Sequence, residues 1–296
     1  MNFKEELAKR VEEIEEIIKA YLPKEEGNQK VVLQAMNYSI LSGGKRLRPM
    51  LMQEAYRLYG GKEEIVKPFM AALEMIHTYS LIHDDLPAMD NDEYRRGRKT
   101  THMVYGEAMA ILAGDGLLNY AFETAAGAFC LKPGDGRVER AFSILAKKAG
   151  IYGMIGGQTA DILAEEREEM LSLEELLYIH ENKTAALIQS ALTIGAVLAG
   201  AGKEQIARME KVGFDLGVAF QIQDDILDVT GSMEKLGKPV GSDERNHKAT
   251  YVTLVGLEKA GKEQEELSKE ALKLLEGEGA GSFFKQLVQS LITRES

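Results

Sequence analysis

Two clusters of aspartates, each at the end of an apolar helical run, constrain this chain more than any other feature. One lies in residues 81–90 (LIHDDLPAMD) and the other in residues 220–228 (FQIQDDILD). A carboxylate beside a hydrophobic core must be paired, bound to a metal or protonated, because an isolated buried charge is costly. The fold must therefore bring cations to both clusters, and the identity of those cations bears directly on function.

In the second cluster, four polar side chains share one face of a helix at positions i, i+3, i+4 and i+7: Gln221, Asp224, Asp225 and Asp228. Asp224 and Asp228 repel each other unless a cation neutralises them. A solvated acidic surface is the alternative interpretation. The apolar residues around the aspartates, such as Ile222 and Ile226, argue against it.

In the first cluster, Asp84 and Asp85 end the apolar run, and Asp90 follows a turn that contains a proline. That turn can fold Asp90 back beside Asp84. Ligands that are all carboxylate oxygens suit a hard cation, and an open arrangement suits Mg²⁺ that also holds substrate phosphates. The spacing is not that of an EF-hand, and neither His77 nor His83 has a partner at zinc-site spacing.

Composition favours helix. Apolar residues make up 45% of the 296 residues, tryptophan is absent and only 6 prolines occur, so the sequence predicts an all-α fold. No Pro/Gly/Ser-rich linker interrupts it, and we predict a single domain over residues 1–296. The expected helices cover approximately residues 2–20, 28–41, 45–59, 63–85, 102–130, 138–167, 172–201 and 203–229, followed by three shorter ones.

Charge and cysteine content exclude some functions. A formal net charge of −11 argues against nucleic acid as a partner. The single Cys130 excludes an internal disulfide, fits a reducing compartment and is expected to pack as a small hydrophobe.

The uncharged run 185–201 is shorter than the ~20 residues of a bilayer span, so we expect a helix buried within the protein. The charged first 19 residues do not resemble a signal peptide, and we expect a soluble, cytoplasmic protein.

Basic side chains accompany the acidic clusters. They follow a glycine turn, follow the first acidic cluster, or lie within a helix beside apolar neighbours: Lys45, Arg46 and Arg48; Arg95 and Arg96; and Lys183 with Thr184. Each alone is usually a surface charge. Together they would supply donors for two diphosphates, one of them bridged by metal to the carboxylates.

These motifs resemble the trans-isoprenyl diphosphate synthases. The resemblance rests on Gly43-Gly44-Lys45-Arg46-Leu47-Arg48-Pro49, Asp84-Asp85 with Asp90, Arg95-Arg96-Gly97, Lys183-Thr184, and Gln221 with Asp224-Asp225 and Asp228. The gap containing Pro87-Ala88 is similar to the bacterial farnesyl diphosphate synthase branch, and Gly157-Gln158 with Asp161, Gly237-Lys238 and Lys248 also fit. The resemblance covers nearly the whole chain and implies one large helical bundle around a central apolar cavity.

The resemblance also implies roles for individual residues. Magnesium ligands would be Asp84, Asp85, Asp90, Asp224 and Asp228. The allylic diphosphate would be held by Arg95, Lys183, Lys238 and Lys248. Isopentenyl diphosphate would be bound by Lys45, Arg48, His77 and Arg96. Thr184 and Gln221 would line the space where the allylic cation forms. Two to three Mg²⁺ per site are implied, with Mn²⁺ as a substitute, and so is a homodimer, for which the helix 102–130 is a candidate interface.

The implied activity is a prenyltransferase reaction. It would condense isopentenyl diphosphate with dimethylallyl and geranyl diphosphate, head to tail, and release pyrophosphate. Tyr79, followed by Ser80, lies five residues before Asp84, about 7.5 Å along the helix axis. A ring there would limit the product to the C15 farnesyl diphosphate, with a C20 or C10 product as the alternative.

Two rival functions remain. A terpene cyclase also ionises an allylic diphosphate, but it would not need the second set of diphosphate cations. A non-catalytic synthase subunit typically loses an acidic motif, and here both are present. The chain departs from the family in two places: only Arg294 stands near the terminus, where relatives often carry a basic cluster, and Asn91 follows Asp90 where relatives often carry aspartate.

Overall fold

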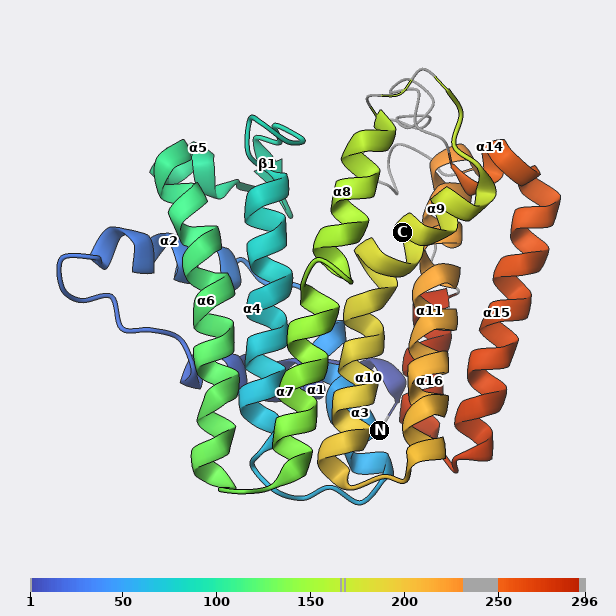
Figure 1. Cartoon of the computed structure of the whole chain (residues 1–296), viewed down its shortest axis with the longest axis horizontal. Coiled ribbons are helices and arrows are strands. Elements are labelled where there is room, and N and C mark those ends of the chain that lie inside the picture. The colour runs from blue at the N-terminus through green and yellow to red at the C-terminus, as the bar shows by residue number, and fades with distance from the viewer. Residues whose placement is uncertain (1, 166, 168, 231–249, 293–296) are drawn as a thin grey trace. The chain divides into compact units, whose positions relative to one another are not determined.

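The elements in the computed structural model follow the helix-forming composition. The structure describes residues 2–165, 167, 169–230 and 250–292 (Figure 1). Helices dominate, and the all-α fold predicted from the sequence is confirmed. The chain divides into two compact units, because Cα atoms lie close to one another more often within each unit than between them. One unit contains residues 1–53 and 62–142, and the other contains residues 54–61 and 143–296. The single domain over residues 1–296 stays a prediction.

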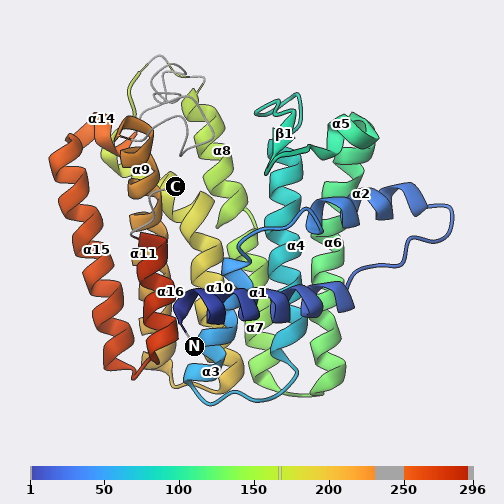
Figure 2. The same ribbon diagram turned by 180° about the vertical axis from the view of Figure 1, so that it is seen from behind.

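The first unit is built around α4, which ends at the first acidic cluster. Its helices are α1 (Phe3–Ala20), α2 (Lys30–Ile40), the first part of α3 (Leu47–Leu58), α4 (Val66–Asp84), α5 (Thr101–Tyr105), α6 (Glu107–Leu131) and the start of α7 (Gly136–Ala149). Apolar side chains bury α4 along most of its length, and α4 packs lengthwise against α6 (Figures 1 and 2). This packing holds the acidic end of α4 in place.

Glycines break two helices that the sequence predicted to be continuous. The helix expected over 102–130 is α5 followed by α6, because Gly106 has a φ of 85°. The helix expected over 138–167 is α7 followed by α8 (Met154–Glu165). A Cβ on Gly153 would lie 2.1 Å from the carbonyl oxygen of Lys148, so this turn requires glycine. Cys130, expected in the core, is exposed because it lies on the outer face of α6.

A two-residue turn forms the one hairpin found in the described residues. Arg96 (φ 54°) and Gly97 (φ 74°) connect β1 (Tyr94–Arg95) to β2 (Arg98–Lys99) in antiparallel pairing. Positive φ at both positions matches the turn geometry that two-residue hairpins prefer. The strands are too short for an alternating pattern, which is why the sequence did not predict them.

The second unit is built around the helices α10 and α11. Its elements are α8, α9 (Leu173–Ile179), the π-helix η1 (His180–Ala185), α10 (Ala186–Ala199), α11 (Lys203–Thr230), α14 (Tyr251–Val255), α15 (Leu257–Gly277) and α16 (Ser282–Ile292). Ser172 and Glu175 have the sequence spacing of a capping box, and they form one through reciprocal hydrogen bonds at the start of α9. The apolar run is buried, as predicted. No helix in the described part of the chain is both long and apolar enough to span a membrane.

Candidate active site

The end of α4 brings two predicted metal ligands together. Asp84 is the last residue of α4, and the backbone N–H of Asp90 donates to the carbonyl oxygen of Asp84 at 2.9 Å. The proline turn therefore folds Asp90 back to the helix end. Asp84 is half-buried and Asp90 is exposed, so both carboxylates border solvent from which a hydrated cation can enter.

Asp85 faces a cation of the protein itself. Its Oδ1 accepts a hydrogen bond from Arg95 Nε at 2.7 Å, and Arg95 also lies 3.6 Å from Asp92. Burial raises the pKa of Asp85, and the charge and hydrogen bond of Arg95 oppose that rise. Asp85 and Arg95, which the sequence assigned to metal and to diphosphate, are thus bonded to each other in this structure.

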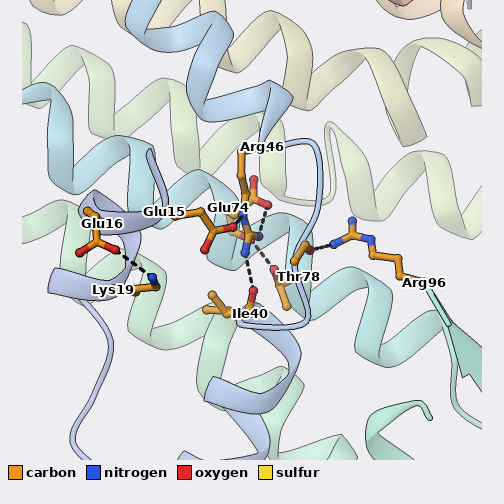
Figure 3. Close-up of polar contacts among 9 residues, drawn as sticks. Glu15, Glu16, Lys19, Ile40, Arg46, Glu74, Thr78 and Arg96 are labelled. Carbon is orange, nitrogen blue, oxygen red and sulfur yellow. Dashed lines mark hydrogen bonds and ion pairs between the residues drawn. The ribbon is translucent and has the colours of Figure 1, made fainter. Parts of the chain in front are cut away.

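Arg46 anchors the cationic loop that precedes α3. Its side chain is buried and donates to Glu15 at 2.6 Å, to Glu74 at 2.7 Å and to the carbonyl oxygen of Ile40 at 2.6 Å (Figure 3). The sequence grouped Arg46 with the other basic residues of the loop. Because its donors are committed to α1, α2 and α4, we assign it to fixing the loop backbone, where its own φ is 48°.

The Arg46–Glu74 pair yields a stability prediction. Removing one partner of a buried ion pair leaves an uncompensated charge, so Glu74→Gln should lower the free energy of unfolding by about 3 kcal/mol. Urea denaturation measures this directly. The exposed pair between Lys19 and Glu16, 2.8 Å apart in the same view, is the control, and Glu16→Gln should leave the midpoint unchanged (Figure 3). Equal midpoints for both variants would contradict the anchoring role.

Arg48 and His77 lie side by side at the start of α3 and on α4. Arg48 Nη1 lies 3.3 Å from His77 Nε2, and the buried Nε of Arg48 has no hydrogen-bond partner among the described residues. Burial, followed by the charges of Arg48 and Arg96, lowers the pKa of His77 well below its usual value. The imidazole is therefore neutral near pH 7. Arg48 keeps its positive charge and a donor for a bound anion.

The hairpin adds further cations to the same unit. Arg96 donates to the carbonyl oxygen of Gly43, which ties the hairpin to the loop of Arg48. A small open pocket between α2, α4 and the hairpin has four charged lining residues: Asp85, Arg95, Arg96 and Lys99. Lys45 is exposed on the loop. Three of the four residues predicted to bind isopentenyl diphosphate, Arg48, His77 and Arg96, are thus linked by contacts or charge within this unit.

Tyr79 is buried on α4, and Ser80 follows it. The Tyr79 ring meets that of His83 edge to face, with centroids 5.8 Å apart, and Ser80 Oγ donates to the carbonyl oxygen of His77 at 2.9 Å. Burial, and then the charge of Asp84, raise the pKa of Tyr79 to about 12. A Cβ on Gly114 would lie 2.0 Å from His83 Nε2, so α6 packs closely behind these rings.

In the second unit, η1 carries Lys183 and Thr184. Lys183 Nζ lies 2.5 Å from Asp161 of α8, and Thr184 Oγ1 donates to Gln221 of α11 at 2.5 Å. Two glycines let the neighbouring helices approach η1: a Cβ on Gly157 would lie 2.1 Å from the amide nitrogen of Lys183, and one on Gly217 would lie 2.3 Å from the Cβ of Ala185. These contacts hold η1, which carries Lys183 and Thr184, against α8 and α11.

The second acidic cluster lies at the end of α11. Asp224 and Asp228 are half-buried, whereas Asp225 is buried and its Oδ2 accepts the backbone N–H of Tyr251 at 2.6 Å. The predicted diphosphate ligands Lys238 and Lys248, like Gly237 and Arg294, lie outside the described residues.

Comparison with known proteins identifies the family. The family model described as "Polyprenyl synthetase" matches residues 29–291. This chain belongs to that family. The farnesyl diphosphate synthase of Geobacillus stearothermophilus is 47% identical over 249 residues, which cover 82% of this chain and 81% of the relative. The geranylgeranyl diphosphate synthase of Cyanophora paradoxa is 44% identical over 265 residues, 90% of this chain and 87% of the relative.

A solved structure of a polyprenyl synthetase relative supports the fold. The geranyltransferase of Helicobacter pylori, complexed with magnesium and isoprenyl diphosphate, is 33% identical with a TM-score of 0.82 and covers 99% of this chain and 97% of its own. The family and the prenyltransferase class predicted from the motifs are confirmed. The roles of the individual site residues stay predictions.

The donor set of this polyprenyl synthetase suits an ion that is only partly coordinated by protein. Among the described residues, no three or more His, Cys, Asp or Glu side chains converge closely enough to form a complete cage. Mg²⁺ typically binds through one or two carboxylates and keeps waters and substrate phosphate oxygens as its other ligands. The paired aspartates at the end of α4 fit that mode of binding.

Sequence reasoning left several residues of this region without a role. Asp161 was noted only as part of a motif, and Asp225 only as a member of the acidic cluster. His180 and Tyr251 were not singled out. The signals in the sequence for η1 are the glycines Gly157 and Gly217, because a glycine facing a helix allows close approach.

Proposed function

We propose that this chain is a magnesium-dependent prenyltransferase that condenses isopentenyl diphosphate with dimethylallyl and geranyl diphosphate to give farnesyl diphosphate and pyrophosphate. One observation carries this proposal: both aspartate motifs and the cations for two diphosphates occur together within a family match over residues 29–291. The Geobacillus relative, 47% identical, supports the C15 product.

The aspartates would hold Mg²⁺ against the allylic diphosphate. The ligands would be Asp84, Asp85, Asp90, Asp224 and Asp228. The H. pylori relative complexed with magnesium and isoprenyl diphosphate supports the use of Mg²⁺. Two to three bound Mg²⁺ would neutralise the negative charge that develops on the leaving pyrophosphate. The other cations on that diphosphate are Arg95, Lys183, Lys238 and Lys248.

The second substrate binds on the cationic loop. Lys45, Arg48 and Arg96 hold the diphosphate of isopentenyl diphosphate, and neutral His77 donates a hydrogen bond to it. Arg48 is suited to this role because its Nε is buried without a protein acceptor. A guanidinium binds phosphate oxygens through two parallel bonds, which fixes the orientation of the substrate.

Bond formation then needs no nucleophilic side chain. The allylic C–O bond breaks with its electron pair on pyrophosphate, and the double bond of isopentenyl diphosphate attacks the carbocation. A proton leaves the new intermediate for the departed pyrophosphate. Thr184 and Gln221, bonded to each other at 2.5 Å, line the space where the cation forms. Exclusion of water there prevents quenching to an alcohol.

The functional form is a cytoplasmic homodimer that pairs through α6. Exposed apolar side chains on α5 and α6 support this interface: Met103, Val104, Ile111 and Leu112. Apolar patches of this kind on a soluble enzyme mark interaction surfaces. Sedimentation velocity measures the oligomeric state.

Product analysis tests the proposed function. The purified chain is incubated with Mg²⁺, dimethylallyl diphosphate and radiolabelled isopentenyl diphosphate, and the dephosphorylated products are sized by chromatography. We expect label in a C15 alcohol. In a parallel incubation with geranyl diphosphate alone, hydrocarbon products would indicate a terpene cyclase. No product in either incubation would indicate a non-catalytic subunit. Either result would overturn the proposal.

Tyr79→Ala should lengthen the product. Removing the buried ring would open space beside α4 for a longer chain, so label should move from C15 to C20 and longer alcohols. Tyr79→Phe, which keeps the ring, is the matched control and should still give C15. An unchanged product distribution in Tyr79→Ala would remove this residue from chain-length control. A C20 product from the unmodified chain would instead match the Cyanophora relative.

A further inference from the structure

We propose that Asp225 is a positioning residue that holds η1, and with it Lys183, against α11, rather than a magnesium ligand. The inference rests on the proposed function, because it assigns one aspartate of the second acidic motif to a different task from its neighbours. All of the contacts concerned lie within the second unit.

Asp225 is already engaged by the start of α14. The side chain is buried, with 8% of the residue exposed, and Oδ2 accepts the N–H of Tyr251 at 2.6 Å. Tyr251 is the first residue of α14, where backbone N–H groups have no partner inside the helix. A carboxylate that accepts such an N–H forms a strong, charge-assisted hydrogen bond. Asp225 therefore joins the ends of α11 and α14.

His180 connects the same carboxylate to η1. It is the first residue of η1 and only 5% exposed, and its Nε2 lies 3.8 Å from Asp225 Oδ2. Its ring stacks on that of Tyr251 with centroids 6.2 Å apart and an angle of 26° between the planes. Burial lowers the pKa of His180 to about 4, so the ring is neutral and the contact is packing rather than an ion pair. η1, α11 and α14 thus meet at Asp225.

This junction controls the placement of catalytic groups. Lys183 lies three residues after His180 on η1, and Thr184 bonds to Gln221, one turn before Asp225 on α11. A π-helix departs from the usual hydrogen-bond ladder and depends on such tertiary support. A shift of η1 by 1 Å would misplace Lys183, and errors of that size reduce turnover by about 100-fold.

Neighbouring aspartates give a matched test. Asparagine keeps an oxygen that can accept the Tyr251 N–H but removes the anionic charge that a metal requires. Asp225→Asn should therefore keep kcat within about fivefold of the unmodified enzyme, whereas Asp225→Ala should lose about 100-fold. In both, the Mg²⁺ concentration for half-maximal rate should be unchanged. Asp224→Asn, the same change one residue earlier, should lose activity and require more Mg²⁺.

The outcomes separate the two ideas. If Asp225→Asn lost as much activity as Asp224→Asn and required more Mg²⁺, Asp225 would be a metal ligand and the inference would be wrong.

If the unmodified chain had no prenyltransferase activity, the proposed function would fail first. Hydrogen–deuterium exchange then still decides the positioning role: amides of residues 180–185 should exchange faster in Asp225→Ala and at the normal rate in Asp225→Asn. Equal exchange in both would overturn it. His180→Phe, which keeps the stacked ring, should also exchange normally.

Discussion

Replacing Asp84 by asparagine should lower kcat by about three orders of magnitude while the protein remains folded. Asp84 is the last residue of α4, and its carbonyl oxygen accepts the N–H of Asp90 at 2.9 Å, so the two carboxylates sit on one turn. The amide keeps the size of the side chain but cannot neutralise Mg²⁺. Without the ion, the pyrophosphate leaving group carries its full charge and the allylic C–O bond does not ionise.

Steady-state kinetics with saturating Mg²⁺ measure this effect. Asp115→Asn is the control, because Asp115 is exposed on α6, 3.8 Å from His83, and has no role in the proposed site. Its kcat should equal that of the unmodified enzyme. Turnover by Asp84→Asn within tenfold of the unmodified enzyme would refute the assignment of Asp84 as a metal ligand.

Arg48→Ala should raise the KM for isopentenyl diphosphate by about 100-fold. The truncation removes a guanidinium with a buried, unpartnered Nε from the cationic loop, and neutral His77 cannot replace its charge. The KM for geranyl diphosphate should change little, because other cations hold the allylic substrate. Initial rates with each substrate varied in turn separate the two constants.

A second arginine on α3 provides the control. Arg57 is partly exposed and pairs with Glu54 of the same helix at 3.2 Å. Arg57→Ala should leave both KM values unchanged. If Arg48→Ala raised both constants equally, Arg48 would be supporting the fold rather than binding one substrate. That result would contradict the division of cations between the two diphosphates.

The sequence predicted the helices and the positions of the acidic motifs well, because both depend on local patterns. Apolar periodicity predicted α4 and α11, and the spacing of a serine–glutamate capping box indicated the start of α9. The breaks between α5 and α6 and between α7 and α8 were not predicted, because each depends on the conformation of a single glycine. Gly106 takes a φ of 85°, and an isolated glycine inside an apolar pattern does not reveal whether it will do so.

The sequence could not predict which residues of the site pair with partners that are distant along the chain. Arg46 meets Glu74 across 28 residues, and Asp225 meets Tyr251 across 26. Nothing local distinguishes a buried arginine of this loop from its exposed neighbour Lys45. The π-helical turn at Lys183 likewise depends on Gly157 and Gly217, which lie on other helices. Lys238 and Lys248 lie outside the described residues, and their roles stay predictions.

Calorimetric titration with an unreactive thio analogue of geranyl diphosphate tests the central claim, that both acidic motifs bind the allylic diphosphate through Mg²⁺. The unmodified chain should bind the analogue tightly with Mg²⁺ and weakly with EDTA. Asp84→Asn and Asp224→Asn should each weaken the Mg²⁺-dependent binding by about 100-fold. Binding that is equally tight without Mg²⁺, or unaffected by either substitution, would contradict the claim.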